Sequence, residues 1–231
     1  MPVYRLSKDL VFPDPHLADE NGLLAIGGDL SPERLLLAYY NGIFPWYSKG
    51  DPILWWSPNP RMILNPTKFK VSHSLKQLIN SGKYQIRFDT VFTEIIAHCA
   101  AVPRKEQDGT WITTPMKKAY IRLHELGFAH SVETWQNNQL VGGLYGISIG
   151  KAFFGESMFH LARDASKFAT FHLVELAKSL DFHFIDAQQE TEHLISLGAE
   201  AIPRESFLQN LGKAMEYDSA RGLWTTLPRE N

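Results

Sequence analysis

The stretch from Val141 to Gln188 constrains the fold of this chain more than any other. Three of its segments are rich in β-branched and aromatic residues, which favours strands, and a helical segment precedes the last of them. Two of the strands carry an acid: Glu156 lies inside an apolar run, and Asp186 follows Phe184-Ile185. A carboxylate in an apolar strand needs a cationic partner or a shifted pKa, so this stretch predicts a sheet that carries a chemical centre.

Each of these acids also has a simpler interpretation. Glu156 could be a surface acid at a strand end, the more frequent fate of a single Glu, and Asp186 could cap a turn. Gln188 favours the functional interpretation, because residues two apart on an extended strand point to the same face and an amide orients a partner without titrating. We therefore expect Asp186 and Gln188 to form an acid/base and hydrogen-bonding centre.

Four glycines thin out one strand of the same stretch, at positions 142, 143, 146 and 150. They indicate either a bulge or bend, or backbone that a ligand approaches closely. Their spacing matches neither a dinucleotide-binding fingerprint nor a Walker loop, so both interpretations stay open.

The remaining segments predict an α+β fold with a mixed sheet, since three strands follow one another as a meander and Asn137-Asn138 marks a hairpin turn. A helix start at Ser31-Pro32-Glu33 and five prolines between residues 45 and 66 predict a small N-terminal α/β domain over residues 1–66. A larger domain then covers residues 67–231. The expected helices are 33–41, 72–81, 90–101, 115–126, 164–180, 192–197 and 205–215, and the expected strands of the larger domain are 84–88, 130–135, 139–149, 151–158 and 182–187.

Composition excludes several classes of protein. The chain has one cysteine, Cys99, so neither an internal disulfide nor a cysteine-based zinc site is possible. Its nine histidines form no His-x-x-x-His pair around an acid, so we expect no metal site. No apolar run reaches the ~20 residues of a membrane span, and we expect no membrane association and a cytoplasmic location.

The net charge of -2 leaves only a local patch for any contact with nucleic acid. Basic residues gather loosely in the middle of the chain, and each is an ordinary solvated charge or part of a surface that faces phosphates. The tryptophans in polar or proline-rich contexts belong to the core or stack on an unpaired base, a contact worth ~1–3 kcal/mol. The residues concerned are Lys76, Lys83, Arg104, Lys117 and Lys118, with Trp46 and Trp111.

Several blocks of the sequence are similar to one family over almost the whole chain. They are Asn21–Leu30, Gly42–Trp46, Trp55–Pro58, Gly109–Thr113, Gly155–Phe159 and Asp186–Gln188. On these blocks the chain resembles the bacterial leucyl/phenylalanyl-tRNA–protein transferases. The resemblance implies transfer of Leu or Phe from aminoacyl-tRNA to the N-terminal amine of proteins that begin with Arg or Lys, which marks them for degradation. It also implies an acetyltransferase-like fold for the larger, catalytic domain, and no cofactor.

The resemblance assigns roles to individual residues. Asp186 and Gln188 match the catalytic positions, with Asp186 as base or electrostatic partner of the acceptor amine. Trp46 and Trp111 match positions that contact the terminal adenosine of the tRNA. Glu156 is our hypothesis for the acidic wall that holds the acceptor's amine or basic side chain. An apolar pocket for the donor's side chain is expected from Phe153, Met158, Leu144, Leu173 and Ile185.

Two other functions are compatible with the same fold. The first is a non-catalytic module that binds tRNA or a degradation signal; only the transferase moves labelled Leu from tRNA to a peptide. The second is an N-acetyltransferase that uses acetyl-coenzyme A. The chain lacks the expected pyrophosphate loop, Arg/Gln-x-x-Gly-x-Gly, before the helix that starts near Asp164, so this function is disfavoured.

Overall fold

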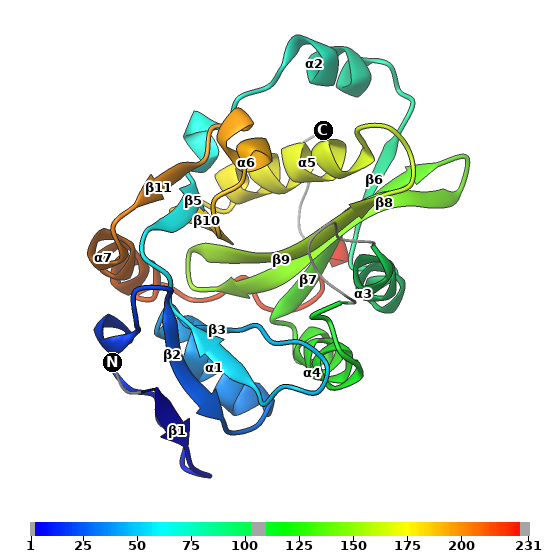
Figure 1. The fold of residues 1–231 in the computed structure, drawn as a ribbon. Helices are drawn as coiled ribbons and strands as arrows, with labels where there is room; N and C mark the ends of the chain where they lie inside the picture. The colour runs from blue at the N-terminus through cyan, green and yellow to red at the C-terminus, as the bar shows by residue number, and fades with distance from the viewer. Residues whose placement is uncertain (1–2, 103–109, 227–231) are drawn as a thin grey trace.

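The computed structural model describes residues 3–102 and 110–226, which form two sheets with helices packed on them (Figure 1). The smaller sheet has the strand order β1-β2-β4-β3 and lies beside the helix α1 (Pro32–Tyr40). Its strands are β1 (Tyr4–Leu6), β2 (Leu23–Gly27), β3 (Phe44–Pro45) and β4 (Leu54–Trp56). The side chain of Ser31 caps α1 by accepting a hydrogen bond from the N–H of Arg34, as the Ser-Pro start predicts.

The larger sheet has seven strands in the order β11-β5-β10-β9-β8-β7-β6. Strand β10 is parallel to β9 and antiparallel to β5, so the sheet is mixed and the expected α+β class is confirmed. Its strands are β5 (Arg61–Leu64), β6 (Gln85–Phe88), β7 (Ala129–Gln136), β8 (Gln139–Ile149), β9 (Ala152–His160), β10 (Phe184–Gln188) and β11 (Glu200–Ile202).

The expected helices are present, each with ends within two residues of the predicted ones. They are α2 (His73–Asn80), α3 (Phe92–Ala101), α4 (Thr114–Glu125), α5 (Ala165–Ser179), α6 (Glu192–Ser196) and α7 (Arg204–Ala214), besides α1. The five expected strands of the larger sheet are found as well, whereas its strands β5 and β11, and β1 of the smaller sheet, were not predicted. In the described residues, no helix combines the length and the apolar composition that a membrane span needs.

Glycines let helices approach both faces of β8. A Cβ on Gly142 would lie 2.6 Å from the Cβ of Ala165 in α5, and a Cβ on Gly143 would lie 2.7 Å from Ile95 in α3. Neighbouring residues of a strand point to opposite faces, so α5 covers one face of the sheet and α3 the other. At Gly146 the pairing of β8 with β9 shifts register, which is the bulge that one of the two sequence interpretations expects.

The two sheets share one apolar core. Leu24 and Trp55 of the smaller sheet belong to the same buried cluster as Tyr120 of α4 and Phe154 of β9. Strand β5 precedes the boundary predicted at residue 66, yet it pairs with β10 and β11 in the larger sheet. The division into residues 1–66 and 67–231 stays a prediction, and the shared core brings side chains from α1 to the surface of the larger sheet.

Candidate active site

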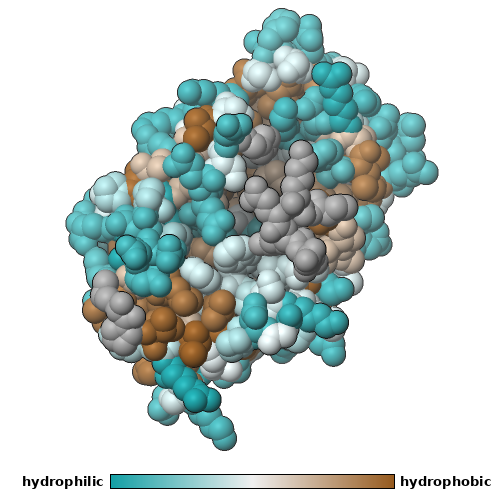
Figure 2. All heavy atoms as spheres, in the orientation of Figure 1, coloured by the Kyte–Doolittle hydropathy of each residue, from teal (hydrophilic) through white to brown (hydrophobic). Residues whose placement is uncertain are grey.

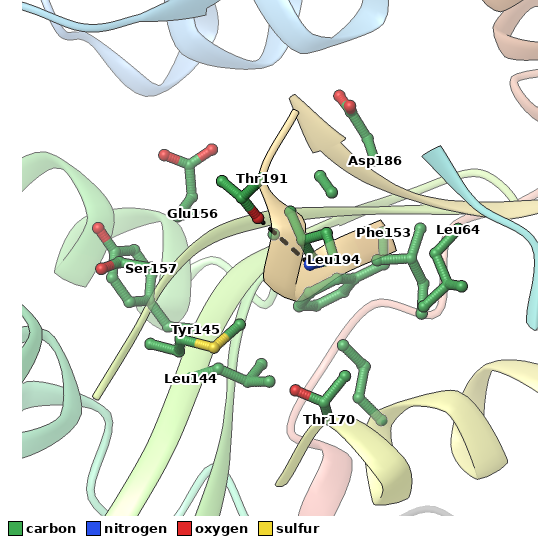
Figure 3. Close-up of a pocket in the computed structure, with 15 residues that line it drawn as sticks. Leu64, Leu144, Tyr145, Phe153, Glu156, Ser157, Thr170, Asp186, Thr191 and Leu194 are labelled. Atoms are coloured by element: carbon green, nitrogen blue, oxygen red, sulfur yellow. Dashed lines mark hydrogen bonds between the residues drawn. The ribbon is translucent and has the colours of Figure 1, made fainter. Parts of the chain in front are cut away.

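An apolar hollow of about 400 Å³ opens between β8, β9, β10 and α5, and we call it the first hollow (Figure 3). All five residues predicted for the aminoacyl pocket line it, namely Leu144, Phe153, Met158, Leu173 and Ile185. Figure 3 shows the carboxyl groups of Glu156 and Asp186 at one end of it and Leu144 and Thr170 at the other. A largely apolar cavity with polar groups at one end is typical of a site that binds an apolar side chain and acts on the group attached to it.

A second hollow of about 240 Å³ adjoins the first. Trp46 and Trp111, the residues predicted for the terminal adenosine, both line it, with Phe44 and Gln188. The two hollows share a wall formed by Gly155, Glu156, Ala187, Thr191 and Leu194. The ring of Trp46 is half-buried and stands edge-on to that of Trp56, at a centroid distance of 5.7 Å. A ligand that occupies both hollows therefore passes Glu156.

Asp186 is held by an arginine that the sequence analysis did not single out. Arg61 donates from Nε and Nη2 to the two carboxylate oxygens of Asp186, at 2.9 and 2.6 Å, and both side chains are buried. The guanidinium also donates to the carbonyl of Gly42 and lies between the rings of Phe44 and Phe207. Such a bidentate pair fixes the position of Asp186 and neutralises its charge.

Gln188 connects Asp186 to Glu156. Its backbone N–H donates to Oδ1 of Asp186 at 2.9 Å, and its side-chain Nε2 donates to Oε1 of Glu156 at 2.8 Å. Gln188 has φ of 63°, and the pairing of β10 with β5 shifts register between residues 186 and 188. The expectation that both side chains share one face by simple strand alternation is therefore wrong, because the chain leaves the extended conformation at this point.

Glu156 is surrounded by hydroxyl groups. Tyr39 of α1 contacts its Oε1 at 2.7 Å, Tyr120 of α4 contacts its Oε2 at 2.9 Å, and the two hydroxyl oxygens lie 2.5 Å apart. Burial is the main cause that raises the pKa of Glu156 from 4.5 to about 7; the hydrogen bonds oppose this effect and the nearby charge of Asp186 adds to it. Burial beside Glu156 also raises the pKa of both tyrosines well above 10, so both hydroxyls keep their protons.

Three residues of this network had no assigned role in the sequence analysis. Tyr39 and Tyr120 lie on amphipathic helices, where a buried tyrosine is ordinary core. Arg61 did offer a signal, because it begins the apolar strand Arg61–Leu64, and a charge in such a strand needs a partner.

The basic residues predicted to face tRNA do not lie together. Lys76 and Lys83 are exposed on or beside α2, which packs on α5, whereas Lys117 and Lys118 lie on α4 at the other side of the molecule (Figure 1). Arg104 falls outside the described residues. Polar side chains cover most of the face shown in Figure 2, and the apolar side chains on it gather mainly beside the N-terminal strands. Within the described residues, no three His, Cys, Asp or Glu side chains are placed to hold a metal ion.

Comparisons with known proteins agree on one family. Residues 63–212 match the family described as leucyl/phenylalanyl-tRNA protein transferase, and residues 28–59 match its N-terminal domain. The transferase of that name from Desulfatibacillum aliphaticivorans is 56% identical to this chain over 231 residues. The alignment covers 100% of this chain and 99% of the relative. The one from Myxococcus xanthus is 55% identical over 227 residues, 97% of each chain.

Among solved structures, a GCN5-related N-acetyltransferase from Kribbella flavida has a TM-score of 0.38 and 10% sequence identity to this chain. The alignment covers 72% of this chain and 59% of the acetyltransferase. The two matched segments contain all residues that line the two hollows, and they contain Asp186. Arg61 lies between the two segments. On the extent of that match and the identity to relatives over the full length, this chain belongs to the leucyl/phenylalanyl-tRNA protein transferase family.

Proposed function

We propose that this protein transfers Leu or Phe from aminoacyl-tRNA to the N-terminal amine of proteins that begin with Arg or Lys, and so marks them for degradation. The names of its relatives support transfer from tRNA to protein. The observation that carries the proposal for this chain is the wall that the two hollows share at Glu156, which Gln188 of the second hollow contacts by a hydrogen bond. An aminoacyl-adenosine has the same two-part form, an apolar side chain and a base joined at a reactive ester.

In this proposal the donor's side chain enters the first hollow. Leu144, Met158 and Leu173 give it apolar walls that suit Leu and Phe, which are both unbranched at Cβ. Met is flexible and adapts to either guest. Shape alone favours the correct side chain by ~1–3 kcal/mol per methylene, so Val and Ile are disfavoured rather than absolutely excluded.

The adenosine enters the second hollow beside Trp46 and Trp111. The ester then lies at the shared wall, next to Glu156 and Gln188. Because the ester is already activated, the protein needs only to position the acceptor's amine and to manage its proton. Gln188 orients the reacting groups, and Asp186, paired with Arg61, holds the backbone of Gln188 in place.

The preference for Arg or Lys at the acceptor's N-terminus is assigned to the acidic group in this wall. Glu156 lines both hollows and, within the described residues, makes no ion pair with a basic side chain, so the positive charge of the acceptor would be the first to lie against it. The ionised form of Glu156 gains stability when a cation lies against it, because an opposite charge lowers a carboxyl pKa.

The test is transfer of radiolabelled Leu from Leu-tRNA to peptides that differ only in their first residue. We expect transfer to peptides that begin with Arg or Lys and little transfer to those that begin with Glu or Ala. Asp186→Asn should lose most of the activity while its circular dichroism and bound tRNA stay unchanged. The matched control is Asp181→Asn, at a turn that lines neither hollow. Binding of tRNA without any transfer by the wild type would instead identify a non-catalytic binding module.

A further inference from the structure

The C-terminal segment, residues 215–225, runs over the surface from α7 to the turn between α4 and β7 and inserts one side chain into the interior (Figure 1). Within this segment only Trp224 is buried, with 2% of its surface exposed. Arg221 anchors the segment nearby, because its Nε donates to the carbonyl of Leu126 at 2.9 Å. Trp224 is therefore the point at which the C-terminal segment reaches the core of the larger sheet.

Two polar side chains hold Trp224 in one position. Its backbone N–H donates to Oδ2 of Asp89 at 2.8 Å, and Nδ1 of His130 lies 2.8 Å from the same oxygen. Burial lowers the pKa of His130, so its ring is neutral at pH 7, and Nδ1 is the donor because a carboxylate only accepts. The His130 ring stacks on that of Trp224, with centroids 3.9 Å apart and planes at 4°. Trp224 is thus fixed through its backbone and through one face of its ring.

The apolar neighbours of Trp224 include a wall of the first hollow. Phe153 lines this hollow, and its ring centroid lies 5.7 Å from that of Trp224, within the range of a direct aromatic contact. Trp224 does not line the hollow, so it acts on the hollow through Phe153. Phe88 and Phe182 also contact the tryptophan ring, at centroid distances of 6.5 and 6.4 Å. An interior packed in this way leaves Phe153 no space to move back from the hollow.

We propose that Trp224 is a specificity-determining positioning residue: by backing Phe153 it sets the depth of the first hollow, and with it the ratio of Phe transfer to Leu transfer. This inference rests on the proposed function. Asp89 and His130 contribute to the same role, because they fix the ring against which Phe153 rests. The C-terminal segment thereby takes part in the choice of donor, although it does not line the hollow.

The two donors need different amounts of space in the same hollow. A smaller side chain at position 224 leaves a cavity behind Phe153, into which the neighbouring side chains partly relax. The hollow then gains depth that the ring of Phe can fill and the side chain of Leu cannot. One methylene in an apolar pocket changes discrimination by ~10–200-fold, so even a small displacement of Phe153 is measurable. A general loss of stability would affect both donors alike, so the ratio isolates the positioning role.

The first test uses the graded substitutions Trp224→Phe and Trp224→Leu. Transfer to a peptide that begins with Arg is measured with Leu-tRNA alone and with Phe-tRNA alone. The ratio of kcat/KM for Phe-tRNA to that for Leu-tRNA should rise from the wild type to Trp224→Phe and again to Trp224→Leu, where it should reach ~10 times the wild-type ratio. A ratio that stays the same or falls in both variants would overturn the inference. If Trp224→Leu does not fold, Trp224→Phe decides alone, since it keeps an aromatic ring in the core.

The matched control is Arg221→Met, which weakens the same segment without removing the ring. It loses the hydrogen bond to the carbonyl of Leu126 and the cation over the ring of Phe128, and neither contact involves Phe153. We expect a lower free energy of unfolding and an unchanged ratio of Phe to Leu transfer. If Arg221→Met changes the ratio as much as Trp224→Leu does, any loosening of the segment alters the hollow, and the specific role of the ring is refuted.

A second readout needs no activity. The probes are leucyl- and phenylalanyl-3′-amino-3′-deoxyadenosine, in which an amide replaces the ester, and their Kd values are measured by isothermal titration calorimetry. In Trp224→Leu the phenylalanyl probe should gain on the leucyl probe by about the same ~10-fold factor. If transfer takes place but the ratio of Kd values is unchanged, the inference fails and the proposed function stands. If the ratio of Kd values shifts but the wild type transfers neither amino acid, the proposed function fails and the control of the hollow by Trp224 stands.

Discussion

The protonation of Glu156 makes a prediction about the stability of the fold, independent of any substrate. Glu156 is 8% exposed, and burial raises the pKa of its carboxyl from 4.5 to about 7. The perturbation is Glu156→Gln, which keeps the size of the side chain, replaces one acceptor oxygen by an amide donor and removes the ability to ionise. The replaced hydrogen bond affects stability equally at every pH, so the pH dependence isolates the ionisation.

The direction in which stability changes with pH follows from the pKa values of Glu156 in the unfolded and the folded chain. Below about pH 4.5 the carboxyl is protonated in both the folded and the unfolded chain, so ionisation has no effect on stability. As the pH rises from 4.5 to 7, the unfolded chain releases the proton and the folded chain retains it, which lowers the free energy of unfolding. One pKa unit corresponds to about 1.4 kcal/mol, so above pH 7 the wild type has lost about 3 kcal/mol that the Gln variant keeps.

Urea unfolding at pH 4.5, 6 and 8, followed by tryptophan fluorescence, measures this difference. The free energy of unfolding of the Gln variant relative to the wild type should increase by about 3 kcal/mol from the lowest to the highest pH. Glu200→Gln, which alters an exposed acid paired with Lys68, is the control. Its free energy of unfolding relative to the wild type should change little between the three pH values. A constant difference between Glu156→Gln and the wild type at all three values would refute the reasoning.

Three further predictions concern other parts of the site. Arg61→Met leaves Asp186 buried without its partner and should cost about 3–5 kcal/mol of unfolding free energy in urea; a cost below 1 kcal/mol would mean that the pair is not buried as described. Trp46→Ala should raise KM for Leu-tRNA by ~5- to 150-fold if the ring stacks on the terminal base, and an unchanged KM would remove that contact. Leu173→Phe fills part of the first hollow and should reduce transfer of Phe more than transfer of Leu, in assays with each aminoacyl-tRNA alone; an unchanged ratio would place the donor elsewhere.

Local signals predicted the elements of this fold well. Ser31, in the predicted helix start, caps α1 with its side-chain oxygen, and Asn137 and Asn138, in the predicted hairpin turn, both have positive φ. Such signals depend on residues close together in the chain, so they can be recognised without knowledge of the rest of the structure.

The site was predictable only in part, for a related reason. The residues of β9 and β10 were recognisable because acids stand out in apolar strands, and the family resemblance gave them roles. Their partners come from far away in the sequence: Arg61 is 125 positions from Asp186, and Tyr39 is 117 from Glu156. Pairing at that separation is decided by sheet order and by the contact between the two sheets, which no local pattern reveals.

The placement of the donor is the claim on which the rest of the account depends, and a structure with a stable donor analogue tests it most directly. In leucyl-3′-amino-3′-deoxyadenosine an amide replaces the reactive ester. We expect its leucyl side chain among Leu144, Met158 and Leu173, its adenine beside Trp46 and Trp111, and its amide within ~3 Å of a side-chain atom of Glu156 or Gln188. An analogue bound with its leucyl group outside the first hollow, or with its amide remote from Glu156, would contradict the account.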